Sequence, residues 1–347
     1  VLYGDGAVGG AINIVTRPSA VFSRANIGAA LGSYGLRQAN ASGVRASMGW
    51  WLGIDTIATF SDGYRVNNEL RQRGFVVNAR RFVAGGEWFL RSTVDGQHLG
   101  LPGARRVTDT TSEIDMDPRT AATPHDFSSQ TGHRTILGMS RRLAGGSELV
   151  IDGGLRVKAQ DSVVISAWGP ANDTTTNTRL STVSLTPRIR TASGIFGVDY
   201  IYSDYNQIAR TGTGVTPTHR YDLKQHSMAA YGQNTLRFQP SLRVAIGGRL
   251  QQTRFNGGDV LDPNATIRFG ESLYDGHRET EIHWDTSWAG HVGLDWDATP
   301  AATVFLRSGR SFRAPTVDER VLSTDAYNSF RLRTQTSWDV ELSLIHI

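Results

Sequence analysis

The chain has 347 residues, of which 39% are hydrophobic and 20% are charged, and it contains no cysteine. A chain without cysteine has no disulfides, zinc–thiolate sites or cysteine nucleophiles. No apolar run approaches the roughly 20 residues that a transmembrane helix requires, so a membrane protein of this composition must be a closed barrel. The net charge of +4 comes from scattered arginines rather than from a basic stripe, which argues against nucleic acid as a partner.

The first segment, residues 1–17, is rich in glycine and then becomes apolar and alternating. It reads VLYGDGAVGGAINIVTR. Its glycines permit tight turns and close backbone approach, and Ile12, Ile14 and Thr16 alternate as in a short strand. A phosphate-binding loop would open onto a helix and carry GKS/T or GxGxxG in that context, and neither is present.

Residues 1–17 resemble the end of the plug domain of TonB-dependent outer-membrane receptors. The signature of that segment is LYG, any residue, GA, any residue, GG, a small residue, INIVT and a basic residue. The match rests on Tyr3, Gly4, Gly6, Ala7, Gly9, Gly10 and Asn13. The resemblance implies that residues 1–17 end a plug domain and that residues 18–20 link it to a barrel.

From residue 21 to residue 342 the chain is expected to form the barrel, because alternating segments recur with turn residues between them. The clearest segment is 242–253. There Leu242, Val244, Ile246, Gly248 and Leu250 share one face, and Arg243, Ala245, Gly247, Arg249 and Gln251 share the other. We predict about fourteen strands, which start near residues 21, 35, 49, 73, 86, 128, 146, 180, 195, 225, 241, 284, 300 and 334.

The connections between these strands alternate in length. Short ones are predicted at 47–49, 84–86, 144–146, 192–194, 239–241 and 298–300, and long ones at 62–72, 97–127, 159–179, 206–224, 256–283 and 310–333. Short periplasmic turns and long extracellular loops are typical of outer-membrane barrels. A soluble β-sandwich is the alternative, but its loops have no reason to alternate so regularly. The predicted fold class is therefore an all-β, transmembrane antiparallel β-barrel.

Two later stretches also resemble the receptor family. Phe312, Arg313, Ala314 and Pro315 form its FRAP motif, and residues 334–342 resemble the strand that follows, with Arg333 and Thr334 where the family usually has Lys-Pro. The family's barrel has 22 strands. The resemblance therefore implies that this chain is a part of such a barrel, and residues 343–347, which stop without a turn, are expected to be a non-native tail.

Candidate ligand contacts are cations in two places. Arg105 and Arg106 lie in the long loop 97–127, and Arg243 and Arg249 are predicted to face the lumen, where they would either attract an anionic substrate or fill a polar interior. The carboxylates at 113, 115 and 117 lack the glycine turn of a calcium loop and indicate a solvated acidic loop. Tyr200, Tyr202, Trp288 and Trp296 are candidates for an aromatic belt or for core packing.

The resemblance implies an outer-membrane receptor for active uptake of a scarce nutrient. A ferric siderophore is the first expectation, and cobalamin, haem or sugar are alternatives. The inner-membrane TonB complex would be the partner, through an N-terminal box that this sequence does not contain, together with a small-molecule ligand and outer-membrane lipid. A passive porin-type channel is the alternative from another class. No cofactor beyond a transported iron chelate, no resident metal and no catalytic arrangement is expected.

Overall fold

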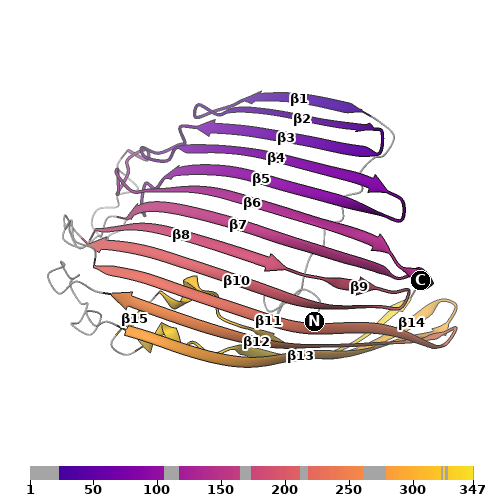
Figure 1. The fold of residues 1–347 in the computed structure, drawn as a ribbon. Helices are drawn as coiled ribbons and strands as arrows, with labels where there is room; N and C mark the ends of the chain where they lie inside the picture. Colours follow the sequence, from indigo (N-terminus) through magenta and orange to yellow (C-terminus); the bar gives the residue numbers. More distant parts are fainter. Residues whose placement is uncertain are drawn as a thin grey trace.

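The computed structural model describes residues 23–104, 117–164, 173–211, 218–260, 279–321, 323–324 and 327–346. These residues form one curved antiparallel sheet (Figure 1). Its strands are β1 (Arg24–Leu31), β2 (Arg37–Ser47), β3 (Trp50–Ser61), β4 (Leu70–Val83), β5 (Gly86–Gly100), β6 (Phe127–Arg142), β7 (Glu148–Val164), β8 (Thr174–Leu185), β9 (Arg188–Arg190), β10 (Gly194–Thr211), β11 (His219–Gln239), β12 (Leu242–Val260), β13 (Glu279–Thr299), β14 (Ala302–Arg313) and β17 (Gln335–His346).

Each strand pairs with the next along the chain, as in an up-and-down barrel. Fourteen of the described strands form a single path from β1 to β17, and the short β9 pairs with β7 and β10 beside it. The all-β prediction is therefore confirmed, and the strand starts agree with the predicted ones within a few residues for most strands. The pair β15 (Ser323–Thr324) and β16 (Tyr327–Asn328), which lies apart from the main sheet, was not predicted.

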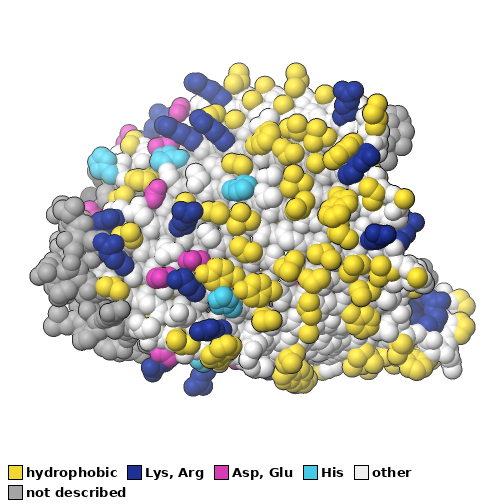
Figure 2. Space-filling model, viewed as in Figure 1, with side chains coloured by type: hydrophobic (Ala, Val, Ile, Leu, Met, Phe, Trp, Pro, Cys, Tyr) yellow, Lys and Arg dark blue, Asp and Glu magenta, His cyan; other side chains and the backbone are white. Residues whose placement is uncertain are grey.

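The two faces of the sheet differ as the alternation predicts. On β12, Ile246 and Leu250 are 49% and 59% exposed on the convex side, whereas Arg249 and Gln251 are 5% and 2% exposed on the concave side. Figure 2 shows hydrophobic side chains gathered over one broad region of the convex face, with charged side chains on both sides of it. A sheet of this kind presents an apolar surface to lipid and a polar surface to the lumen.

Several strands extend further than predicted. The predicted loops 206–224 and 256–283 are shorter, because β10 continues to Thr211, β11 begins at His219 and β12 continues to Val260. Polar residues pair in register there, for example Asn206 with Asp222. Many outward residues of these extensions are polar, so the pattern of apolar outward residues ends while the backbone ladder continues.

The described short connections are tight turns that use left-handed backbone conformations. Met48 and Gly49 have φ values of 50° and 76° between β2 and β3, and Gly85 has φ 78° between β4 and β5. Two-residue hairpins favour such conformations because their twist matches that of the strands. The predicted short turns at 47–49 and 84–86 are therefore present.

A proline separates β8 from β9, which both lie between β7 and β10. Pro187 follows Thr186, whose amide donates to the carbonyl of Asp152 at 2.9 Å. The chain resumes pairing at Arg188, opposite Val150. Proline has no N–H to donate to a ladder, which explains why the predicted single strand near residue 180 is two strands in the structure.

At the other end of the sheet, β14 leads into residues 314–334, of which the described stretches 314–321 and 327–334 lie along the concave face before β17 begins. We call residues 314–334 the strap. Strand β17 then pairs with β14 as far as His346, so residues 343–346, expected as a tail beyond the barrel, belong to the sheet. Whether they are native sequence stays a prediction. The described part of the chain contains no helix long and apolar enough to cross a membrane.

Two of the three outward tryptophans of β13, Trp288 and Trp296, have the spacing of an aromatic belt. Trp288 and Trp296 are about half exposed on the convex face. Eight residues of antiparallel strand are about 27 Å long, or roughly 19 Å of height at a 45° tilt, which is comparable to the apolar band of outer-membrane barrels. Val292 lies midway between them and faces outward, paired with Ile246.

This geometry predicts that a charged side chain on the outward face lowers the stability of the protein, and that the loss depends on its depth in the membrane. Val292→Arg should destabilise the folded protein in a bilayer by about 2–4 kcal/mol, because position 292 lies at the middle of the apolar band. Phe238→Arg, next to the turn at 240–241, should cost only about 0–1 kcal/mol, because it lies near the interface. Urea unfolding in lipid vesicles measures both values, and equal costs at the two positions would contradict the placement of the band.

Candidate functional site: the lumenal cavity and its strap

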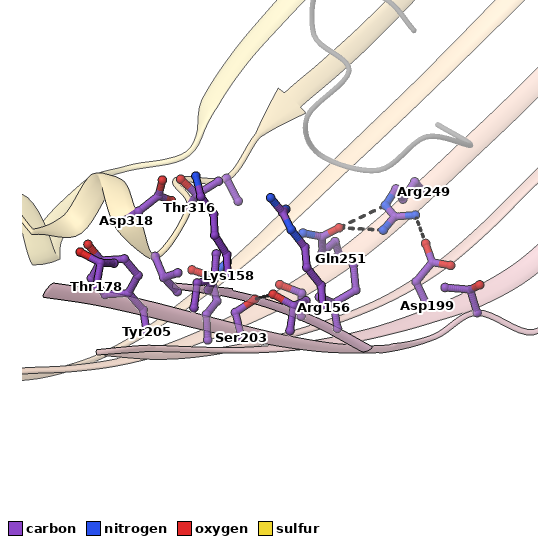
Figure 3. Close-up of a pocket in the computed structure, with 18 of the residues that line it drawn as sticks. Arg156, Lys158, Thr178, Asp199, Ser203, Tyr205, Arg249, Gln251, Thr316 and Asp318 are labelled. Carbon is purple, nitrogen blue, oxygen red and sulfur yellow. Dashed lines mark hydrogen bonds and ion pairs between the residues drawn. The ribbon is translucent and has the colours of Figure 1, made fainter. Parts of the chain in front are cut away.

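The concave face contains a cavity of about 990 Å³. Strands β7 to β12 form its wall, and Ala314, Thr316, Val317 and Asp318 of the strap close one side (Figure 3). This volume is within the range of small-molecule sites. The cavity is therefore the first candidate for ligand binding.

Hydroxyl and amide side chains dominate the wall of this cavity. They come from alternate residues of adjacent strands, because those residues share the lumenal face. The hydroxyls of Thr182 and Ser203 lie 3.3 Å apart on β8 and β10, and Gln251 on β12 accepts from Arg249 at 3.1 and 2.9 Å. Such a wall offers many donors and acceptors to a polar ligand.

Two arginines of the wall are neutralised by carboxylates. Arg249 forms a 2.7 Å ion pair with Asp199 across three strands, and its guanidinium also lies 5.6 Å from the centre of the Tyr231 ring. Arg188 forms a 2.5 Å pair with Asp152. A buried arginine requires such partners because removing a charge from water is costly. These two arginines therefore hold the wall together.

The strap is fixed to the wall by an apolar cluster. Val317 and Phe330 of the strap are buried against Tyr205, Leu223 and Phe255 of β10, β11 and β12. The rings of Phe255 and Phe330 have centroids 5.8 Å apart. Because these aromatic and aliphatic side chains lie on the lumenal face of a sheet that is otherwise polar there, the cluster provides a specific docking place for the strap.

Charged groups fix the strap at three further points. The Arg320 guanidinium is buried 4.4 Å from the centre of the Phe255 ring and donates to the carbonyl of Phe330. Arg313 donates to the carboxylate of Glu319, and the hydroxyl of Thr334 donates to Asp285. The strap is therefore held at both its beginning and its end.

Glu319 closes the first turn of the strap. Its carboxylate accepts from the amide of Thr316 at 2.9 Å and from the hydroxyl of Thr316 at 3.2 Å, in addition to Arg313. Burial raises the pKa of Glu319, but these hydrogen bonds and the Arg313 charge lower the pKa by more, so it lies below its ordinary value. The ionised form is therefore the one that holds the turn.

The sequence-predicted site residues have different positions in the structure. Phe312, Ala314 and Pro315 are buried where the chain leaves β14 for the strap, and Arg313 is the partner of Glu319. Arg249 lines the cavity, whereas Arg243 lies nearer the short turns and contacts Asp295 at 3.6 Å and Asp297 at 3.4 Å. Their role in ligand binding stays a prediction.

Other predicted residues lie outside the described residues. These are the plug motif Tyr3, Gly4, Gly6, Ala7, Gly9, Gly10 and Asn13, and the loop cations Arg105 and Arg106. Within the described residues, no group of three or more histidines, aspartates or glutamates is placed to hold a metal ion.

Sequence reasoning missed the residues that dock the strap and did not connect Arg156 and Lys158 with a site. Val317, Arg320 and Phe330 follow the FRAP motif, which was recognised, but nothing in their spacing shows that they fold back onto β10 to β12. The structure places Arg156 and Lys158, which lie on β7, in the wall of the cavity. The missing information was the register between strands.

Comparison with known proteins identifies the architecture. The model of a family described as TonB dependent receptor-like, beta-barrel, matches residues 49–345. No curated protein matches the chain.

Solved structures resemble the whole described sheet. The ferric yersiniabactin uptake receptor FyuA from Yersinia pestis is 13% identical with a TM-score of 0.77, over 100% of this chain and 55% of that one. The siderophore receptor PiuA from Acinetobacter baumannii is 12% identical with a TM-score of 0.75, over 98% and 57%. The ferripyoverdine receptor of Pseudomonas aeruginosa, bound to ferripyoverdine, is 11% identical with a TM-score of 0.74, over 95% and 46%. The chain spans about half the length of these proteins, and identities this low establish the fold alone.

The apolar cluster predicts how the strap is released. Phe330→Ala should weaken docking by about 3 kcal/mol or more and so raise the undocked fraction by roughly a hundredfold. Arg320 is buried in the docked strap, so the rate of trypsin cleavage after Arg320 should rise by about the same factor as the undocked fraction.

A matched control for this experiment lies next to Phe330. Arg331→Ala removes a side chain that is 69% exposed and forms a 3.4 Å pair with Glu281, and such surface pairs contribute little. It should leave cleavage after Arg320 unchanged. Equal rates in the two variants would contradict docking through Phe330.

The lowered pKa of Glu319 predicts a pH dependence of the strap. A carboxylate with a depressed pKa stabilises the folded state above its unfolded value and loses that contribution as the pH falls through its folded value. Hydrogen-exchange protection of the Thr316 amide, corrected for intrinsic rates, should be constant down to about pH 5 and fall below the ordinary pKa of 4.5.

Glu319→Gln is the control for this titration. It should show weaker protection of the Thr316 amide at pH 7 and no change through the same pH range, because the substituted side chain does not titrate. An unaltered pH profile in Glu319→Gln would assign the effect to another group.

Proposed function

The chain belongs to the family of TonB dependent receptor-like β-barrels, which are proteins of the outer membrane, and we propose that it functions in energy-coupled uptake of a scarce nutrient, most specifically a ferric siderophore. The family is one of receptors and transporters rather than of enzymes. The three proteins described above are named as receptors for siderophores or their ferric complexes, which supports this choice of nutrient.

One observation carries the proposal at the level of this chain. The concave face contains a polar cavity large enough for a small chelate, and a docked strap covers part of the lumenal wall beside it. A passive channel requires a continuous aqueous path, to which an inward strap held by Val317, Arg320 and Phe330 is an obstacle. A receptor requires a binding surface, which the cavity wall supplies through its hydroxyls, amides and cations.

The proposed partner is the inner-membrane TonB complex. A barrel in the outer membrane has no nucleotide and no ion gradient of its own, so uptake against a concentration gradient requires coupling to the inner membrane. Cobalamin, haem or a sugar would use the same coupling, and they are the alternative ligands against which the siderophore assignment is tested.

The test is uptake by intact cells that express the protein. Radioactive iron presented as a panel of ferric siderophores should accumulate only when the TonB complex and the proton gradient are both functional. Labelled cobalamin, haem and a sugar serve as the competing ligands.

Two results would contradict the proposal. Accumulation that persists without the TonB complex, together with steady conductance in a planar bilayer, would establish a passive pore. Uptake of one of the competing ligands but of no ferric siderophore would replace the proposed nutrient while leaving the coupling intact.

A further inference from the structure

We propose that Arg134, Arg156 and Lys158 form a binding site for a multiply charged oxyanion, in particular a polycarboxylate chelate of ferric iron. We call these three residues the cation row. The inference rests on the proposed function in that it names the charge class of the ligand, but the binding site itself can be tested without transport.

The register of the sheet brings the three cations together on the lumenal face. Arg134 on β6 is directly opposite Arg156 on β7. Lys158 is two residues further along β7 and therefore on the same face. Directly opposite side chains have Cβ atoms only about 5 Å apart, and like charges in such positions are destabilising. The repulsion between these two guanidinium groups lowers the stability of the sheet. A bound anion that contacts both groups therefore explains their placement better than a structural role does.

The cation row lies where two hollows of the concave face meet. A second cavity, of about 490 Å³, is lined by all three residues and by Arg91 and Asp95. The first cavity is lined by Arg156 and Lys158 as well. Figure 3 shows both side chains projecting from the wall into that space. Concave surfaces lined by charge of one sign concentrate counter-ions and speed their capture.

Three arginines elsewhere on the lumenal face have carboxylate partners, and the cation row differs from them in this respect. Arg80 contacts Glu87 at 2.8 Å, Arg188 contacts Asp152 and Arg249 contacts Asp199. No member of the cation row has an ion-pair or hydrogen-bond partner among the residues that the structure describes.

One carboxylate, Asp95, lines the second cavity. An alanine at Gly132 would place its Cβ 2.5 Å from an Asp95 oxygen, so the Asp95 carboxylate lies over the glycine. A single carboxylate cannot neutralise four cations, so the hollow keeps a net positive charge.

The chemistry of the cation row selects the ligand. Guanidinium groups bind carboxylates through two parallel N–H bonds, and such charge-assisted bonds are about twice as strong as neutral ones. Two guanidinium groups and one ammonium group match an anion with several carboxylates. A neutral ferric trihydroxamate carries no net negative charge. Its affinity for the protein should therefore not change when a residue of the cation row is substituted.

The test measures binding to the purified protein in detergent by titration calorimetry. The probes are citrate, ferric citrate and a neutral ferric trihydroxamate. Each of Arg134→Gln, Arg156→Gln and Lys158→Gln should weaken binding of citrate and ferric citrate by about tenfold, the size expected for one charged hydrogen bond. The slope of affinity against salt concentration should also decrease in each variant, because fewer charges take part.

Two controls separate recognition from folding. Arg81→Gln removes a cation of the convex face, 5.3 Å from the Trp50 ring, and should bind the anionic probes as the parent protein does. Arg156→Lys retains the charge and should recover part of the affinity that Arg156→Gln loses. The gel shift that distinguishes folded from unfolded barrels confirms that each variant is folded.

Failure of this inference differs from failure of the proposed function. The cation row is not an anion site if the parent protein binds neither citrate nor ferric citrate, or if the three variants bind them as tightly as Arg81→Gln does. Cells that import no ferric chelate, while citrate binding still depends on the cation row, would refute the uptake proposal and leave the anion site in place.

Discussion

The structure depends on one constraint: each backbone polar group in the membrane must find its partner within the sheet, because hydrocarbon offers none. The antiparallel ladder meets this constraint for the strands of the main sheet between β1 and β17, because each of them is paired on both sides. Where β11 pairs with β12, and β13 with β14, the register shifts only beside the short turns, at Arg237/Gln239 and Asp297/Thr299. The long uninterrupted registers fix which side chains face lipid and which face the lumen.

The chemistry of the lumen follows from this division of side chains between the two faces of the sheet. Its wall is polar, so an apolar cluster there requires a covering element, and the strap supplies it through Val317 and Phe330. Charge is distributed unevenly around the same wall. The arginines Arg188, Arg243 and Arg249 have carboxylate partners, whereas the cation row on β6 and β7 has none among the described residues. The paired side is therefore suited to holding structure, and the unpaired side to holding an anion.

The sequence was sufficient for the parts of the fold that depend on local pattern. The alternation in residues 242–253 identified a strand and both of its faces, and the FRAP motif marked the point where the chain leaves β14. The sequence was insufficient wherever the answer depends on register or on distant packing. The pairing of Arg134 with Arg156 requires knowing how two strands are aligned, and a shift of one residue would reverse the faces. The docking of Phe330 onto Phe255 joins segments far apart in the chain, and no local pattern records it.

The most direct test of this account is a cysteine scan along β12 in lipid vesicles, since the natural chain has no cysteine. Single substitutions from Val244 to Thr253 are labelled with a water-soluble maleimide. Lumenal positions such as Ala245 and Gly247, which are partly exposed, should react, and outward positions such as Val244, Ile246 and Leu250 should be protected by lipid. A reactivity without this two-residue period, or with the opposite phase, would contradict the assignment of the two faces and the lumenal site built on it.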